Sequence, residues 1–176
     1  MCSSDLNATI GTRFKVISGY PGGAEALLAV ERGEVEGYAL VFWSTLKATK
    51  PDWLKNKDIN LLVQLAVEPH PELKDVPLVT GYAKSEADRQ ALNFLFEPLL
   101  LGRPYFAPPG ISPTRLATLR AAFTATMKDA AFLAEAKARD MEIIVKDGTQ
   151  TEKIVRDVYA TPKDVIARVA AIRTEK

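Results

Sequence analysis

The stretch that decides the expected fold is KVISGYPGGAEALLAVERGEVEG, residues 15–37. Its β-branched start predicts a strand at 13–18, and a Gly-Tyr-Pro-Gly-Gly turn comes next at 19–23. The apolar spacing then predicts a helix over 22–32, which Gly33 would end at the C′ position. Such a turn leaves backbone N–H groups unpaired at the positive end of the helix dipole, and these groups favour an anion.

The same alternation of strand and helix patterns continues along the first half of the chain and predicts an α/β fold. Two further apolar runs, at 35–42 and 59–67, are typical of parallel strands buried on both faces. Strand, helix and strand in about 30 residues form a βαβ unit, whose crossover is expected to be right-handed. This alternation stops near 99–109, and beyond that segment the chain is predicted to be mostly helical. Further elements are expected at 85–95, 113–128, 129–140, 148–159 and 162–172 as helices, and at 142–145 as a short strand.

Several helix starts carry capping signals. Ser44 is expected to cap a short helix, and Ser85 with Asp88 three residues later resembles a capping box. Ser112 precedes a proline that suits the first helical position. These signals are local, so they predict helix boundaries independently of the rest of the fold.

Composition excludes several classes of function. The chain has 176 residues and a net charge of +1, without a basic block that would indicate nucleic-acid binding. No apolar run approaches the roughly 18–20 residues of a membrane span. Cys2 is the only cysteine and His70 the only histidine, so a disulfide within the chain, a Ser-His-Asp or Cys-His site and a zinc site are not expected.

The remaining titratable groups do not indicate catalysis, so no enzyme activity and no catalytic residue, metal or cofactor is predicted. His70 lies between prolines and is interpreted as a solvated loop residue, the alternative being a pH-titrating group. Two sets of carboxylates are weighed as a general acid or base: Glu31, Glu34 and Glu36, and Glu142 with Asp147. The first set lies where a predicted helix ends and a strand begins, and it is interpreted instead as a solvated rim.

The turn at 19–24 is the predicted ligand site. Gly22 and Gly23 would let the backbone approach a ligand closely, with their N–H groups directed at a carboxylate or phosphate. Tyr20 would add a hydroxyl donor and an aromatic wall. The alternative is a tightly packed strand–helix turn without a ligand.

Trp43 and Ser44 come directly after the next predicted strand and are expected to line the same crevice, because ligands lie beyond the carboxyl ends of parallel strands. Trp43 would wall the site, or else be a core residue. Ser44 would cap its helix and donate to the ligand.

The first six residues, MCSSDL, differ in character from the rest of the chain and lack the features of a signal peptide. The codons TGC TCT TCC GAT CT for CSSDL resemble the end of a sequencing adapter. Residues 1–6 are therefore predicted to be a non-native leader before a truncated chain, the alternative being a disordered N-terminus. An intact genomic reading frame that encodes MCSSDL would contradict the leader.

Across residues 11–171 the chain resembles the periplasmic solute-binding receptors of the tripartite tricarboxylate transporters, the Bug/TctC-type family. No single motif is diagnostic, but the order and spacing of several agree. They are residues 19–37, NLLVQ (60–64), DVP (75–77), GRP (102–104), APPGI (107–111), RAAF (120–123), MKD (127–129) and YATP (159–162).

The resemblance implies a two-lobed α/β receptor of the periplasmic-binding-protein type (type II), of which this chain would be a fragment. Residues 7–101 would form part of the second lobe, and 102–176 a crossover strand and the C-terminal part of the first. The ligand would be a small carboxylate held at Tyr20, Gly22, Gly23, Ala24, Trp43 and Ser44. The partner would be the membrane permease subunits, and the protein itself would not insert into the membrane.

Two other functions stay open. A sensory module of the same fold would present its ligand to a signalling partner, and an α/β enzyme fragment would use Glu34 or Glu36. In a fragment that lacks most of one sheet, we also expect exposed apolar surface on the helices between Ser112 and Ile172.

Overall fold

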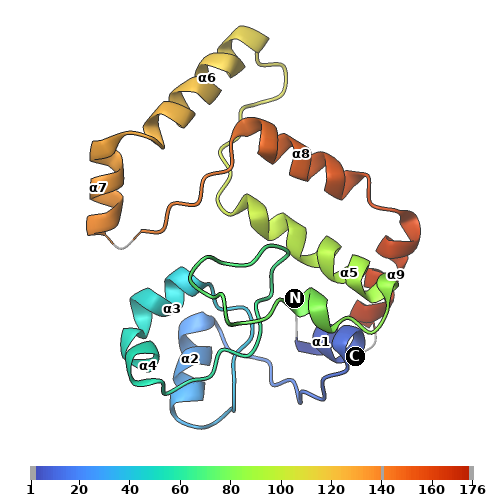
Figure 1. The fold of residues 1–176 in the computed structure, drawn as a ribbon. Helices are drawn as coiled ribbons and strands as arrows, with labels where there is room; N and C mark the ends of the chain where they lie inside the picture. The colour runs from blue at the N-terminus through green and yellow to red at the C-terminus, as the bar shows by residue number, and fades with distance from the viewer. Residues whose placement is uncertain (1–2, 140, 175–176) are drawn as a thin grey trace. The chain divides into compact units, whose positions relative to one another are not determined.

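The structure is a computed structural model, describes residues 3–139 and 141–174, and is 56% helical (Figure 1). It divides into two compact units, residues 1–96 with 161–176 and residues 97–160. Unit 1 contains α1 (Ser3–Ile10), α2 (Gly23–Glu31), α3 (Trp43–Thr49), α4 (Pro51–Asn56), the 3₁₀ helix η1 (Val79–Tyr82), α5 (Glu86–Phe96) and α9 (Lys163–Thr174). Unit 2 contains the 3₁₀ helix η2 (Glu97–Leu101), α6 (Pro113–Thr126), α7 (Ala130–Ala138) and α8 (Gly148–Tyr159).

The predicted α/β fold is wrong. Within the described ranges no sheet forms. Strand-like pairing there is limited to one isolated parallel β-bridge, between Gln64 and Leu78. The chain is therefore not a periplasmic-binding-protein-like α/β fragment. The strands expected at 13–18, 35–42, 59–67 and 142–145 are all absent.

The first predicted strand shows a physical reason for this. The side-chain amide of Asn7 donates to the carbonyl of Phe14 (2.9 Å) and accepts from its N–H (2.8 Å), so it occupies the backbone groups that a neighbouring strand would pair. Apolar β-branched residues indicate a surface that suits a sheet, but a sheet exists only where a second strand closes the hydrogen bonds. Here Phe14, Ile17 and Leu62 are 46%, 50% and 71% exposed.

The core of unit 1 is built by helices from both ends of the chain. Helix α5 packs against α1, η1 and α9, and α1 also contacts α9. The buried cluster consists of Leu6, Val79, Ala91, Leu92, Leu95, Phe96, Val169 and Ile172. Leu6 belongs to the predicted leader and is 5% exposed, whereas residues 1 and 2 lie outside the described residues.

The helix signals were predicted better than the strands. Gly33 has φ +69° directly after the α2 C-cap, and the N–H groups of Gly33 and Glu34 bond back to Val30 and Ala29, as in a Schellman motif. The Ser112 hydroxyl accepts from the Arg115 N–H, as expected for the start of α6. These signals hold because a helix closes its hydrogen bonds within its own segment.

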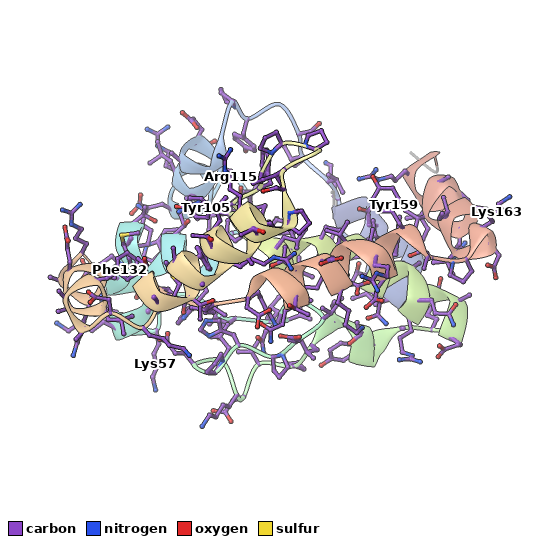
Figure 2. All side chains as sticks on the ribbon, turned by 90° about the horizontal axis from the view of Figure 1, so that it is seen from above. Lys57, Tyr105, Arg115, Phe132, Tyr159 and Lys163 are labelled. Atoms are coloured by element: carbon purple, nitrogen blue, oxygen red, sulfur yellow. The ribbon has the colours of Figure 1, made fainter. Side chains whose placement is uncertain are left out.

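Unit 2 buries few side chains. Among its described residues, η2 packs along α8, and Ala136 and Ile154 are the buried apolar residues. Tyr105 and Tyr159 are 86% and 87% exposed (Figure 2). Leu119 in α6 is 51% exposed, so the expected exposed apolar surface on these helices is confirmed.

Among residues 3–139 and 141–174, none of the helices is both long enough and apolar enough to cross a bilayer.

Candidate functional site

The predicted anion turn begins α2 at a glycine. Gly22 is the N-cap residue, with an extended backbone (φ −164°, ψ −178°) and no side chain that could cap the first turn. Gly23 and Ala24 are exposed and Tyr20 is half-buried. Uncapped N–H groups at a helix N-terminus favour a negative charge, and the binding of a ligand at this turn stays a prediction.

Two side chains of unit 1 lie against this turn. A Cβ atom added at Gly23 would lie 3.3 Å from the Tyr38 hydroxyl oxygen. A Cβ atom at Gly22 would lie 3.0 Å from the Glu25 carboxylate, which is therefore close to the N-terminal end of its own helix. The turn thus already has a carboxylate beside it.

In unit 1, the Trp43 side chain donates a hydrogen bond to a carboxylate. Trp43 is the first residue of α3 and half-buried, and its indole N–H donates to the Glu72 carboxylate at 2.6 Å. Lys47 lies one helical turn later, so both side chains project from one face of α3. The Lys47 ammonium donates to the same Glu72 oxygen at 2.7 Å. Trp43 and Lys47, which we call the carboxylate cradle, therefore hold one carboxylate with two donors.

The electrostatics of the carboxylate cradle favour the ionised carboxyl. The hydrogen bond from Lys47, followed by that from Trp43, holds the pKa of Glu72 below its ordinary value. The Lys47 ammonium also lies 5.5 Å from the centre of the Trp43 ring, within cation–π range. A positive charge and a directional neutral donor thus act together on one anion.

His70 borders the cradle. Its ring meets Trp43 edge-on, with the ring centres 6.4 Å apart, and its Nδ1 accepts a hydrogen bond from the Glu72 backbone N–H at 3.1 Å. His70 was predicted to be a solvated loop residue, but it is half-buried and contacts Trp43 and Glu72.

Gln64 positions the segment that carries Glu72. It is 7% exposed and accepts from the His70 N–H at 2.8 Å. Its amide donates to the carbonyls of Leu73 (3.0 Å) and Val76 (2.6 Å). One buried side chain therefore holds the loop at three residues, one before Glu72 and two after it.

We predict that Gln64→Leu frees this loop. The change removes three hydrogen bonds and leaves their backbone partners unsatisfied, which is expected to lower the free energy of unfolding by about 2 kcal/mol. Amide hydrogen exchange across 70–76 should accelerate in the variant. Gln90→Leu is the matched control, because Gln90 is exposed and its amide makes one bond, at 3.1 Å, to Glu86. Equal exchange in the two variants would contradict the role of Gln64.

The other predicted site residues are placed less favourably. Ser44 is the second residue of α3, which has Phe42 at its N-cap and no side-chain cap, so the expected capping role is wrong. Glu31, Glu34 and Glu36 are exposed, as expected for a solvated rim. Glu31 pairs with Lys50 at 2.7 Å, and Asp147 caps α8.

Sequence reasoning missed Lys47, Gln64 and Glu72. Lys47 could have been found, because its four-residue spacing from Trp43 places both on one helix face. Glu72 lies 29 residues from Trp43 in an irregular loop, so no periodic signal connects the two.

Comparison with known proteins adds no relative. Protein-family models, curated proteins and solved structures were compared with the chain, and none matches.

Proposed function

We propose that this protein is a binding protein that captures a small carboxylate and carries out no reaction on it. The observation that carries the proposal is the carboxylate cradle, in which Trp43 and Lys47 hold the Glu72 carboxylate at 2.6 and 2.7 Å. Two donors on one helix face that converge on one carboxylate support a site for a carboxylate ligand.

The physiological setting of the proposal comes from the resemblance to the tricarboxylate-transporter receptors. It makes the protein an extracytoplasmic, periplasmic receptor that delivers its ligand to the permease subunits of a transporter. The two-lobed fold is not part of the proposal, because the α/β architecture was wrong. What remains is recognition by a few side chains on α3.

The cradle is expected to bind weakly when it acts alone. An exposed ion pair contributes about 0.2–1 kcal/mol, and a hydrogen bond to a charged group about 1.5–3 kcal/mol. Their sum, about 1.7–4 kcal/mol, corresponds to a dissociation constant of about 1–60 mM. A test must therefore report on Trp43 itself.

The indole N–H resonance of Trp43 provides that report. The chain has two tryptophans, and Trp53→Phe leaves Trp43 as the source of the remaining indole signal. In a Trp53→Phe/Glu72→Gln protein, succinate, citrate and benzoate should each be titrated at constant ionic strength. We expect a saturable downfield shift of the indole proton, because the ligand carboxylate takes the acceptor position that the Glu72 carboxylate holds in the parent protein.

Two controls make the result specific. Adding Lys47→Gln should abolish saturation, since the charge is lost while the indole stays. Succinamide should produce no shift, since it matches succinate in shape without its charge. If chloride at the same ionic strength moves the resonance as far as the carboxylates do, the proposed function is wrong.

A further inference from the structure

We propose that Glu72 is a tethered competitor for the carboxylate cradle, so that an external carboxylate binds by displacing Glu72 and thereby releases its loop from α3. This inference rests on the proposed function. It adds a built-in control of ligand access at the same site.

The loop is attached to the rest of unit 1 in two different ways. On one side, the buried Gln64 side chain bonds to residues 70, 73 and 76. On the other, Glu72 reaches α3 with a side chain that is 50% exposed. Solvent and solutes reach the Glu72 contact, whereas the Gln64 contacts are covered. Glu72 can therefore leave the cradle while Gln64 keeps the loop folded.

The exchange is chemically like for like. An external carboxylate offers the indole N–H and the ammonium the same kind of acceptor that Glu72 offers, and no bond is made or broken covalently. Glu72 has the advantage of its tether, which gives it an effective concentration in the millimolar range or above. For a ligand whose own dissociation constant is about 1 mM, an effective concentration of about 10 mM raises the apparent dissociation constant about tenfold.

His70 would report the displacement. It is the only histidine of the chain, and its Nδ1 accepts from the Glu72 backbone N–H at 3.1 Å. Its ring also meets Trp43 edge-on. Movement of Glu72 away from α3 changes both contacts, so the His70 ring resonances should shift as the cradle fills with ligand.

The test compares three proteins in a Trp53→Phe background: the parent, Glu72→Ala and Asp75→Asn. Asp75 lies in the same loop and is exposed, and Asp75→Asn removes one negative charge at a residue that makes neither of the cradle's hydrogen bonds to Glu72. Succinate is titrated into each, and the Trp43 indole and His70 ring resonances are monitored. We expect Glu72→Ala to bind about tenfold more tightly than the other two. In the parent, His70 should shift along the same saturation curve as Trp43.

The outcomes separate this inference from the proposed function. Equal affinities in the parent and Glu72→Ala would overturn the inference and leave carboxylate binding in place. Tighter binding in Asp75→Asn and Glu72→Ala alike would also overturn it, since general charge repulsion would then explain the gain. Absence of binding in all three would refute the proposed function. If Glu72→Ala loses its dispersed spectrum, Glu72→Gln replaces it, since Gln keeps the side-chain length and removes the charge.

Discussion

Replacing Ile172 by alanine is expected to lower the free energy of unfolding of unit 1 by about 3 kcal/mol. Ile172 is 1% exposed and belongs to the cluster where α9 packs with α1 and α5. Truncation removes apolar surface from the core and leaves a cavity that the neighbouring helices fill only in part. The effect is large because total stabilities are themselves about 5–15 kcal/mol.

Ile166→Ala is the matched control. Ile166 lies in the same helix, but it is 44% exposed, so its truncation should change stability by about 0.5 kcal/mol or less. Both tryptophans, Trp43 and Trp53, belong to unit 1, so urea unfolding monitored by tryptophan fluorescence reports on that unit. Equal losses in the two variants would show that α9 does not pack as described.

Removing the Arg168 guanidinium is expected to produce the second large effect. Arg168 in α9 donates to Asp88 in α5 at 2.8 and 3.1 Å, and Asp88 is 5% exposed. Arg168→Met leaves the carboxylate buried, with the Ser85 hydroxyl still donating to it. Because the Arg168 side chain is 36% exposed, the expected loss is about 2 kcal/mol, between the values for buried and exposed pairs.

The loss should depend on pH in a defined direction. Burial alone would raise the pKa of Asp88, but the hydrogen bonds from Arg168 and Ser85 outweigh it, and the pKa is lowered. A carboxyl whose pKa is lower in the folded state stabilises the fold above its unfolded value, near 3.9, and loses that contribution as the pH falls through the folded value. The difference between the parent and Arg168→Met should therefore shrink below about pH 4.

Arg89→Met is the control that tests whether the loss of stability in Arg168→Met comes from the buried position of the ion pair or from the loss of a positive charge alone. Arg89 pairs with Glu86 at 2.6 Å, but both side chains are more than half exposed. Because solvent screens both groups, its removal should change stability much less than the removal of Arg168 does. Adding Asp88→Asn to Arg168→Met should recover part of the loss, since no charge is then buried. A loss in Arg168→Met that is the same from pH 3 to pH 7 would contradict the ion pair.

The helices and the strands differed in how far they could be predicted. The α8 start at Asp147 and Gln150 forms a capping box whose bonds lie within four residues, so a short window contains its cause. A strand has no such local cause. The backbone N–H and carbonyl of Phe14 form hydrogen bonds with the Asn7 side chain. The apolar run at 59–67 forms one β-bridge, between Gln64 and Leu78. Neither partner can be inferred from apolar content.

The site was predictable to the same degree. Trp43 was selected as a wall of the ligand site from its place after an apolar run. Its indole N–H donates to Glu72 of the same chain, and its contact with a ligand stays a prediction. The rest of the cradle depends on a loop that Gln64 holds from inside, and such an arrangement has no repeating pattern to reveal it. The Gly-Tyr-Pro-Gly-Gly turn begins a helix as expected, without the sheet that was to precede it.

The route of the chain through unit 1 has a consequence for its synthesis. Asp88 and Arg168 are 80 residues apart, and the α1–α5 surface stays open until α9 arrives. At about 5–20 residues per second, a ribosome takes roughly 4 to 16 s to make the intervening segment. Leu92 and Phe96 share their buried cluster with Val169 and Ile172 of α9, so the cluster is incomplete for that interval. A chaperone that recognises apolar helices has its opportunity then, before α9 completes the cluster.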